Sequence, residues 1–236
     1  MLIAILNQSK AVTDADVATM TAAIATQVQN DVAPVWGRPP AEVVFYPGST
    51  AVPPTAYGIA VVDTIPDQPQ GVLGQHTEAQ AAQICAAVAA QPQLDNGGKV
   101  MTGDWSVSST LSHEVLELFV DPNCNLWAND GQGSVYSLEV CDPVEAPTYT
   151  VSGVSVSNFV TPSWYDPQPP AGAQFDKLDQ LTAGFSILPS GYMVYESKGK
   201  EQEQWGGQYP GWRKAMKTGP MARTQQRRVI LAMWHT

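Results

Sequence analysis

The sequence has few charged residues, only three cysteines and no long run of apolar side chains. A helix that crosses a membrane needs roughly 18 or more consecutive apolar residues, and no window approaches that length. The opening run, Met1 to Leu6, is short, and it lacks the basic start and the small-residue cleavage site of a secretion signal. We therefore expect a soluble protein with no membrane partner.

Cysteine usage is typical of a reducing compartment. Cys85, Cys124 and Cys141 are odd in number and far apart, which argues against a disulfide framework. No Cys-x-x-Cys pair is present to build a zinc site of the finger or ribbon type. The expected location is the cytoplasm or, if the source is a virus, the virion.

Lysine and arginine are scarce outside the C-terminal part. Residues 1–197 carry 4 of them against 20 Asp and Glu, whereas residues 198–236 carry 8 against 2. An acidic body discourages nonspecific binding to nucleic acid. The basic segment interleaves its charges with aromatic residues suited to packing, namely Trp205, Tyr209, Trp212 and Trp234. We expect this segment to dock onto a protein partner or onto a second copy of the chain, which would make the protein an oligomer.

Glycine and proline are plentiful at 19 residues each, which indicates many turns and irregular connections. A length of 236 residues is enough to bury a core without covalent cross-links. We expect one α+β domain over residues 1–197, with a β-rich and loop-rich second half, and a basic aromatic tail over 198–236.

Strand and helix patterns alternate in the first half of this domain. Thr13 is a helix N-cap, and apolar residues follow it at helical spacing up to Val32. Short apolar runs that end at proline, glycine or aspartate indicate strands. The expected order is a strand, a helix and four strands, at 1–6, 13–32, 42–46, 57–62, 71–75 and 79–90, although the alanine content of the last segment also suits a helix. These elements predict a mixed twisted sheet with an N-terminal helix.

The second half is expected to contain a buried helix followed by further sheet. Hydroxyl side chains at 106–110 can cap a helix over Thr110 to Val120, which ends before Asp121-Pro122. A hairpin turn is expected at 129–131, strands at 135–141 and 151–160, a proline-rich connection at 162–172 and a strand pair at 185–194.

The expected helix carries three ionisable residues in five positions. His113 and Glu117 are four residues apart and share one helix face, where an imidazole and a carboxylate can bind one divalent cation together. Glu114 lies about 100° further round, from where a carboxylate can accept a proton from water that a cation polarises. The flanking residues are apolar, and a buried helix tolerates ionisable groups only when they have partners. The pattern therefore predicts an active-site helix with a metal cluster.

The segment reads H-E-V-L-E and resembles the H-E-x-x-H signature of the zincin metallopeptidase superfamily. The expected order of elements over residues 1–122 also resembles that of the zincin N-terminal half. The resemblance implies a zincin-like fold, with His113 and Glu117 as metal ligands and Glu114 as the catalytic base. Because a carboxylate stands in place of the second histidine, Zn²⁺ is expected first and Ca²⁺ or Mn²⁺ are alternatives.

A third ligand has to come from elsewhere, because the longer zincin motif H-x-x-G-x-x-H is absent. Glu139 is the first choice, since a carboxylate among valine, leucine and cysteine is costly to bury unless it is paired, protonated or bound to metal. Asp142 and Asp121 are the next candidates. Asp121 also opens an Asp-x-Asn-x-Asn run, but Leu126 and Gln132 stand where a calcium loop needs glycine and glutamate, so an Asx-rich turn is expected.

Functions of different classes fit these residues. One is a metal-dependent hydrolase that cleaves a peptide or related amide with a cation held by His113, Glu117 and a downstream carboxylate. Another is a structural or assembly protein, for example of a virus particle, that keeps a degenerate zincin-like fold and uses the tail as a docking arm. A calcium-stabilised binding module is a third. The simplest alternative is an incidental motif on a solvated helix face.

Overall fold

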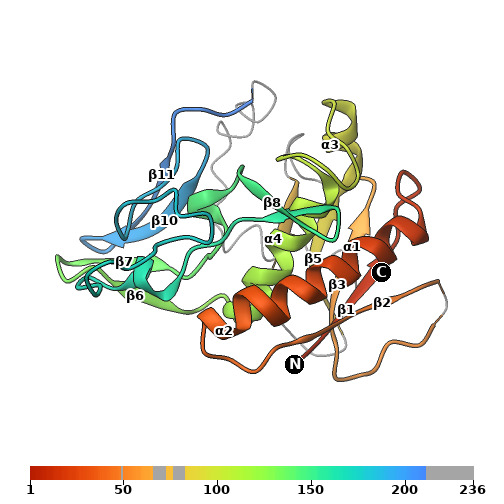
Figure 1. Cartoon of the computed structure of the whole chain (residues 1–236), viewed down its shortest axis with the longest axis horizontal. Helices are drawn as coiled ribbons and strands as arrows, with labels where there is room; N and C mark the ends of the chain where they lie inside the picture. Colours follow the sequence, from red (N-terminus) through yellow and green to blue (C-terminus); the bar gives the residue numbers. More distant parts are fainter. Residues whose placement is uncertain (49, 66–72, 77–82, 211–236) are drawn as a thin grey trace.

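A mixed five-stranded sheet and two smaller antiparallel sheets pack around two 14-residue helices (Figure 1). The computed structural model describes residues 1–48, 50–65, 73–76 and 83–210. Within these ranges no helix is both long enough and apolar enough to cross a membrane. The expected mixed twisted sheet with an N-terminal helix is confirmed.

The larger sheet has the strand order β2-β1-β3-β5-β4. Its parallel strands are β1 (Leu2–Asn7), β2 (Glu42–Tyr46), β3 (Tyr57–Val62) and β5 (Ile84–Ala89). The short strand β4 (Gly74–His76) is antiparallel to β5 and forms one edge of the sheet. The strand expected at 79–90 is confirmed over Ile84–Ala89, Ala90 begins the next helix, and residues 77–82 lie outside the described part of the chain.

The N-terminal helix α1 (Asp14–Gln27) begins with a reciprocal cap. The Thr13 side chain accepts from the backbone of Asp16, and the Asp16 side chain accepts from the backbone of Thr13, which satisfies two amides at the helix start. A π-helical turn over Val28–Val32 and the short helix α2 (Ala33–Val35) continue the segment. The helix expected up to Val32 is therefore confirmed, with a change of helix type in its last turn.

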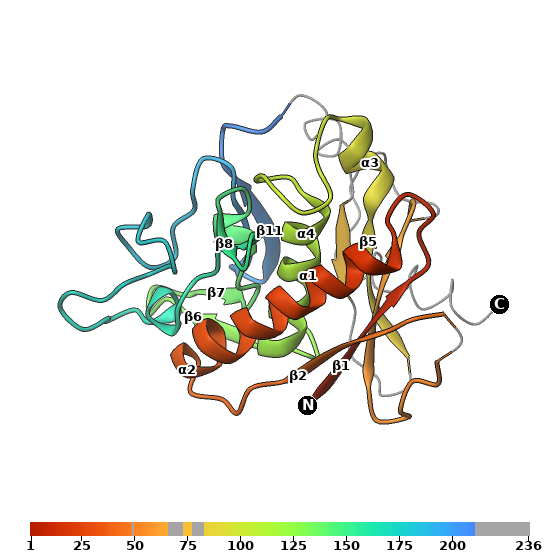
Figure 2. The same ribbon diagram turned by 45° about the vertical axis from the view of Figure 1, so that its right-hand side comes forward.

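Alternating residues of the sheet face two different environments. One face packs with the two long helices into the main core and contributes Ile3, Ile5, Val43, Ile59, Val61 and Val88, each at most 7% exposed. Burial of each such side chain contributes about 1.5–3 kcal/mol. The other face carries small residues in a second cluster, Ala60, Ala87 and Ala89 with Val62 and Ile65. The helices therefore cover one face of the sheet, as Figure 2 shows.

Helix α4 (Val107–Val120) follows the short helix α3 (Ala90–Asp95) and lies between the larger sheet and the C-terminal β-rich half (Figure 2). Ser106 caps it by accepting from the backbone of Ser109, as expected from its hydroxyl-rich start. Twelve of its residues are buried, so the polar side chains in its middle point into protein.

The C-terminal half consists of antiparallel strands joined by turns. One sheet has the order β11-β10-β7-β6, formed by β6 (Trp127–Asn129), β7 (Ser134–Ser137), β10 (Tyr192–Ser197) and β11 (Lys200–Trp205). The other is the hairpin of β8 (Thr148–Val151) and β9 (Val154–Ser157), which packs against α4. The hairpin expected at 129–131 is confirmed, whereas the strand expected at 151–160 is interrupted by a turn at Ser152 and Gly153 between β8 and β9.

Two further predicted segments were wrong in their bounds. The strand expected at 135–141 ends at Ser137, where the Glu139 amide turns back to the Ser137 carbonyl at 3.0 Å, and a 3-10 turn follows at Asp142–Val144. The strand pair expected at 185–194 is instead β10 with β11, and their turn is made by Lys198 and Gly199 with positive φ. The predicted tail thus starts inside this hairpin, and residues 211–236 lie outside the described part.

Candidate metal centre

Helix α4 presents the three ionisable residues of the H-E-V-L-E segment to the protein interior. Glu114 and Glu117 are 3% and 2% exposed, and the side chain of His113 is 12% exposed. Charged groups at such burial are costly unless they are compensated. The solvated helix face of the simplest alternative is therefore contradicted.

The loop after β7 brings further acidic groups to the same place. Its backbone is fixed on several sides: Tyr165 donates through its hydroxyl to the Glu139 carbonyl at 3.1 Å, and the Val160 amide donates to the Val140 carbonyl at 2.7 Å. The Cys141 amide donates to Oε1 of Glu117 at 3.4 Å, which ties the loop directly to α4. Glu139 and Asp142 are only 3% and 1% exposed.

A second clamp holds the far end of this loop. The Leu188 amide donates to the Pro143 carbonyl at 2.9 Å. Gly191 packs so closely on the same carbonyl that a Cβ atom there would overlap it. These contacts fix the 3-10 turn from which the Asp142 side chain reaches α4.

The imidazole of His113 lies close to two carboxylates of the cluster. Its Nε2 lies 3.2 Å from Oε1 of Glu117 and 3.1 Å from Oδ1 of Asp142. Ligand atoms of His113, Glu117 and Cys141 lie within 4.8 Å of one another, and so do those of Glu117, Glu139 and Asp142. Glu117 belongs to both groups, so the two form one continuous cluster.

The acidic surroundings control the protonation of His113. Burial opposes a charged imidazole, but the carboxylates of Glu117 and Asp142 outweigh it and raise the pKa of His113 well above 6.5. Burial also raises the pKa of the neighbouring Tyr165 far above 10, with a further contribution from Glu139 and Glu117. Tyr165 is therefore a neutral phenol at the edge of the cluster.

The Glu114 carboxyl group lies against the edge strand β4 and belongs to neither ligand group. A Cβ atom on Gly74 of β4 would overlap the Glu114 carboxyl group, so the two residues are in close contact. The absence of a side chain at position 74 is what leaves room for this carboxylate. Glu114 thus lies between α4 and β4, one residue along the helix from His113.

Asp121 is the one predicted ligand that belongs to neither group. Its two carboxylate oxygens accept from the amides of Asn125 and Leu126 at 3.2 and 2.9 Å. This is the Asx-rich turn expected in place of a calcium loop. Asp121 therefore ends α4 and shapes the following turn.

The sequence reasoning missed Cys141 and Tyr165. It treated Cys141 as part of the apolar surroundings of Glu139, although the two are separated by a single residue and lie in one loop. That i, i+2 spacing was the available signal. Tyr165 is separated from the motif by 48 positions or more, and nothing local distinguishes it from other aromatic residues.

A polar network supports the helix on the side of Ser112. The Ser112 hydroxyl donates to Oε1 of Gln27 at 2.7 Å and accepts from the Ser157 amide at 3.0 Å. Gln27 in turn donates to the Ser157 carbonyl at 2.9 Å and to the Tyr149 hydroxyl at 3.1 Å. Because α1, α4 and β9 all take part, the network fixes the rotation of α4 next to His113.

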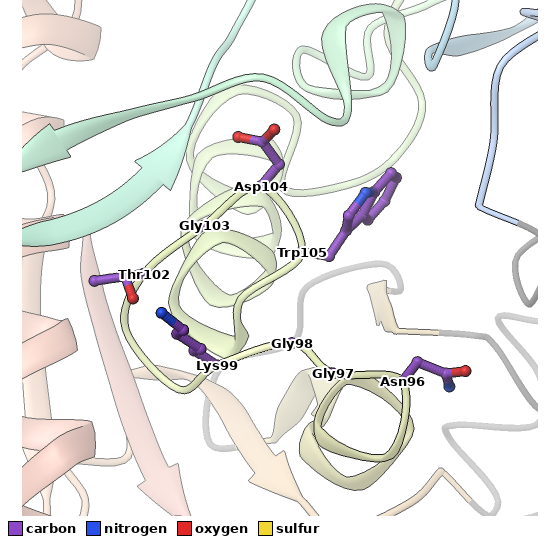
Figure 3. A pocket seen from close by; sticks show the side chains of 8 residues that line it. All are labelled: Asn96, Gly97, Gly98, Lys99, Thr102, Gly103, Asp104 and Trp105. Atoms are coloured by element: carbon purple, nitrogen blue, oxygen red, sulfur yellow. The ribbon is translucent and has the colours of Figure 1, made fainter.

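A separate surface pocket of about 400 Å³ lies in the loop between α3 and α4 (Figure 3). It is lined by Asn96, Gly97, Gly98, Lys99, Thr102, Gly103, Asp104 and Trp105, none of which belongs to the cluster. Figure 3 shows these side chains pointing in different directions rather than toward a common centre. The Asp104 carboxylate is already engaged by the Thr148 hydroxyl at 3.0 Å. The pocket therefore offers no convergent set of polar groups.

Comparison with known proteins adds no assignment: no family model, no curated protein and no solved structure matches the chain. The case for a function consequently depends on the chemistry of the cluster itself.

Proposed function

We propose that the chain binds a divalent metal ion with His113, Glu117 and Asp142, with Glu139 beside them, and that it is a metal-dependent hydrolase of a peptide or related amide. The single observation that carries this proposal is the approach of the His113 Nε2 atom to two carboxylates from different parts of the chain, at 3.2 and 3.1 Å. Both carboxylates are almost fully buried.

The donor spacing fits a small cation. Bonds of about 2.0–2.1 Å from zinc to nitrogen and oxygen, at tetrahedral angles, place neighbouring donor atoms roughly 3.3 Å apart. A protonated imidazole between two carboxylates has the same spacing, and a metal-binding experiment distinguishes it from a metal site. Asp121 is left out of the proposed ligand set because both its oxygens accept amide hydrogens.

In this proposal Glu114 is the catalytic base. A bound cation would polarise the scissile carbonyl and lower the pKa of water. Glu114 would accept the proton of the attacking water and hand it to the leaving amine. His113, Glu117 and Asp142 would hold the cation, and the neutral Tyr165 hydroxyl is engaged with the Glu139 carbonyl rather than in proton transfer.

The zincin-like relationship is part of the proposal. What supports it is the H-E-V-L-E segment on a buried helix that follows a five-stranded sheet whose edge strand, β4, is antiparallel. Glu117 in place of a second histidine would make the set more acidic than the zincin one, with Zn²⁺ still preferred and Mn²⁺ or Ca²⁺ as weaker alternatives.

A second candidate function is favoured by one observation, the burial of the cluster. Its carboxylates are at most 3% exposed, which is closer to a structural metal site than to an open catalytic one. The chain would then be a structural or assembly protein with a degenerate zincin-like fold that docks onto a partner or a second copy through its C-terminal segment.

Glu114→Gln separates the two functions. For the hydrolase, cleavage of a peptide library by the zinc-loaded protein is lost in this variant, while the metal content stays at the wild-type value. For the structural protein, neither wild type nor variant cleaves any peptide, and both bind metal equally. Asp95→Asn is the control, because it changes an exposed carboxylate on α3. It should leave both readouts unchanged.

A further inference from the structure

We infer that Cys141 contributes its thiolate as a ligand to the cation held by His113 and Glu117, and that the site therefore selects a borderline-soft metal such as Zn²⁺ over Ca²⁺ or Mg²⁺. This inference rests on the metal binding of the proposed function. It names a ligand from outside the H-E-V-L-E segment.

The position of Cys141 supports the inference. Its sulfur lies within 4.8 Å of the ligand atoms of both His113 and Glu117. Its own amide donates to Oε1 of Glu117, so the sulfur and the carboxylate are held in one small unit. The neighbouring backbone is fixed by hydrogen bonds to the Val140 and Pro143 carbonyls, which limits how far the sulfur can move.

The other two cysteines show what a structural cysteine looks like in the same chain. Cys85 is in the core strand β5, and its thiol faces the Gln83 carbonyl at 3.5 Å. Cys124 has a positive φ in the turn after α4, where its amide donates to the Asp121 carbonyl. Among the described residues, only Cys141 shares a metal-ligand group with a histidine.

The Cys141 thiol loses one proton when its sulfur coordinates the cation. The S–H bond of Cys141 breaks, the sulfur keeps the electron pair and forms the bond to the cation, and the proton passes to buffer. Burial raises the pKa of the Cys141 thiol, and the nearby His113 lowers that pKa by less. The metal-free protein therefore holds the sulfur as S–H. A coordinated thiol is deprotonated outright by the positive charge of the ion.

A soft sulfur donor decides which metals bind well. Thiolate and imidazole suit Zn²⁺, Co²⁺ and Fe²⁺, whereas Ca²⁺ and Mg²⁺ take oxygen ligands. A purely carboxylate site built from Glu117, Glu139 and Asp142 would show the reverse preference. Metal selectivity therefore reports which of the two donor groups is used.

The test is a Co²⁺ titration of the full chain, freed of metal with a chelator and kept anaerobic. Bound Co²⁺ gives visible absorption whatever its ligands, and a near-ultraviolet charge-transfer band appears only when a thiolate is bound. We expect both signals in the wild type and in the Cys85→Ser/Cys124→Ser double variant, which keeps Cys141 as its only cysteine. Cys141→Ser should keep visible absorption and lose the charge-transfer band.

Each outcome bears on a different claim. If wild type shows visible Co²⁺ absorption with no charge-transfer band, or if the band persists in Cys141→Ser, the sulfur ligand is refuted and the metal site stands. If no Co²⁺ or Zn²⁺ binds at all, the proposed function fails as well. Should Cys141→Ser not fold, X-ray absorption of the zinc-loaded double variant decides, because a sulfur neighbour at about 2.3 Å is expected there and only oxygen and nitrogen neighbours would overturn the inference.

Discussion

Glu117 is the residue that joins the two halves of the cluster. Its carboxylate meets the His113 imidazole at 3.2 Å and the Cys141 amide at 3.4 Å, and it is shared by both groups of ligand atoms. We predict that Glu117→Gln lowers zinc affinity by more than the roughly 10- to 100-fold that substitutions outside the ligand shell cost. The glutamine carbonyl can still accept from the Cys141 amide, so the fold should persist. Competition with a chromophoric chelator measures the affinity.

Asp121→Asn is the matched control for that variant. It also removes one buried carboxylate charge from the end of the same helix, and it lies outside both ligand groups. It should leave zinc affinity within a factor of two or so of wild type, while the weakened turn costs about 1 kcal/mol of stability. Equal loss of affinity in both variants would mean that general acidity, rather than Glu117, attracts the ion.

Because the pKa of His113 is raised, we predict that the stability of the metal-free protein depends on pH. Its pKa in the folded chain is raised well above the usual 6.5, so its contribution to stability is fully present below pH 6.5 and is lost as pH rises through the raised value. Urea unfolding in the presence of a chelator, from about pH 6 to about pH 9, should show stability falling toward alkaline pH. His113→Gln should remove that part of the slope, and an unchanged slope in the variant would contradict the assignment.

At the scale of elements, the orientation of α4 depends on Ser112. Removal of its hydroxyl leaves the Ser157 amide and the Gln27 side chain without this buried partner. Ser112→Ala should therefore cost about 1–3 kcal/mol of unfolding free energy. Thr19→Ala, which removes an exposed hydroxyl bonded only to its own helix turn, should stay within about 0.5 kcal/mol of wild type. Urea denaturation of the two variants side by side makes the comparison.

The turn that carries Asp142 depends on a glycine in the neighbouring segment. A Cβ atom on Gly191 would overlap the Pro143 carbonyl, whereas one on Gly207 would meet nothing within 4 Å. Gly191→Ala should therefore displace the turn, with a stability cost of about 1–3 kcal/mol and weaker zinc binding. Gly207→Ala should change neither quantity. Calorimetric zinc titration checks both, and wild-type affinity in Gly191→Ala would show that the turn can move without losing its ligand.

The elements could be predicted where a pattern was local. The cap at Thr13, the spacing of the helix that carries His113 and the hairpin at 129–131 are set by neighbours in the chain, and the structure has all three. The strand at 135–141 could not be bounded, because it ends at Ser137 and the loop after it is held by tertiary contacts, such as that of the Cys141 amide with a carboxylate 24 positions earlier. The strand pair expected at 185–194 was misplaced because the turn between β10 and β11 lies at Lys198-Gly199, further along the chain.

In the candidate site, too, the features that could be predicted are those set by neighbours in the chain. The helical period alone puts His113 and Glu117 on one face, and the cost of burying a carboxylate indicates Glu139. Sequence could not choose between Asp142 and Asp121, since both precede a proline and their difference is tertiary: one reaches His113 and the other caps a turn.

On the scale of the whole molecule, the cluster joins the two halves of the chain. His113 and Glu117 come from α4, which packs on the larger sheet, and Asp142 comes from the loop after β7 in the β-rich half. A ligand that binds only the folded state stabilises it, by about 2.7 kcal/mol at 100 times its dissociation constant. Zinc should therefore raise the melting temperature of the whole chain in one cooperative transition, and chelator should reverse the rise. A rise of the same size in His113→Ala would place the stabilising ion elsewhere.

The most direct measurement is the metal content of the purified protein after loading with zinc and removal of excess, for wild type beside His113→Ala. A cation that neutralises the buried carboxylates predicts close to one bound metal ion per wild-type chain and far less in the variant. Equal and negligible metal in both proteins would contradict it, and would leave His113 as a protonated imidazole held between Glu117 and Asp142.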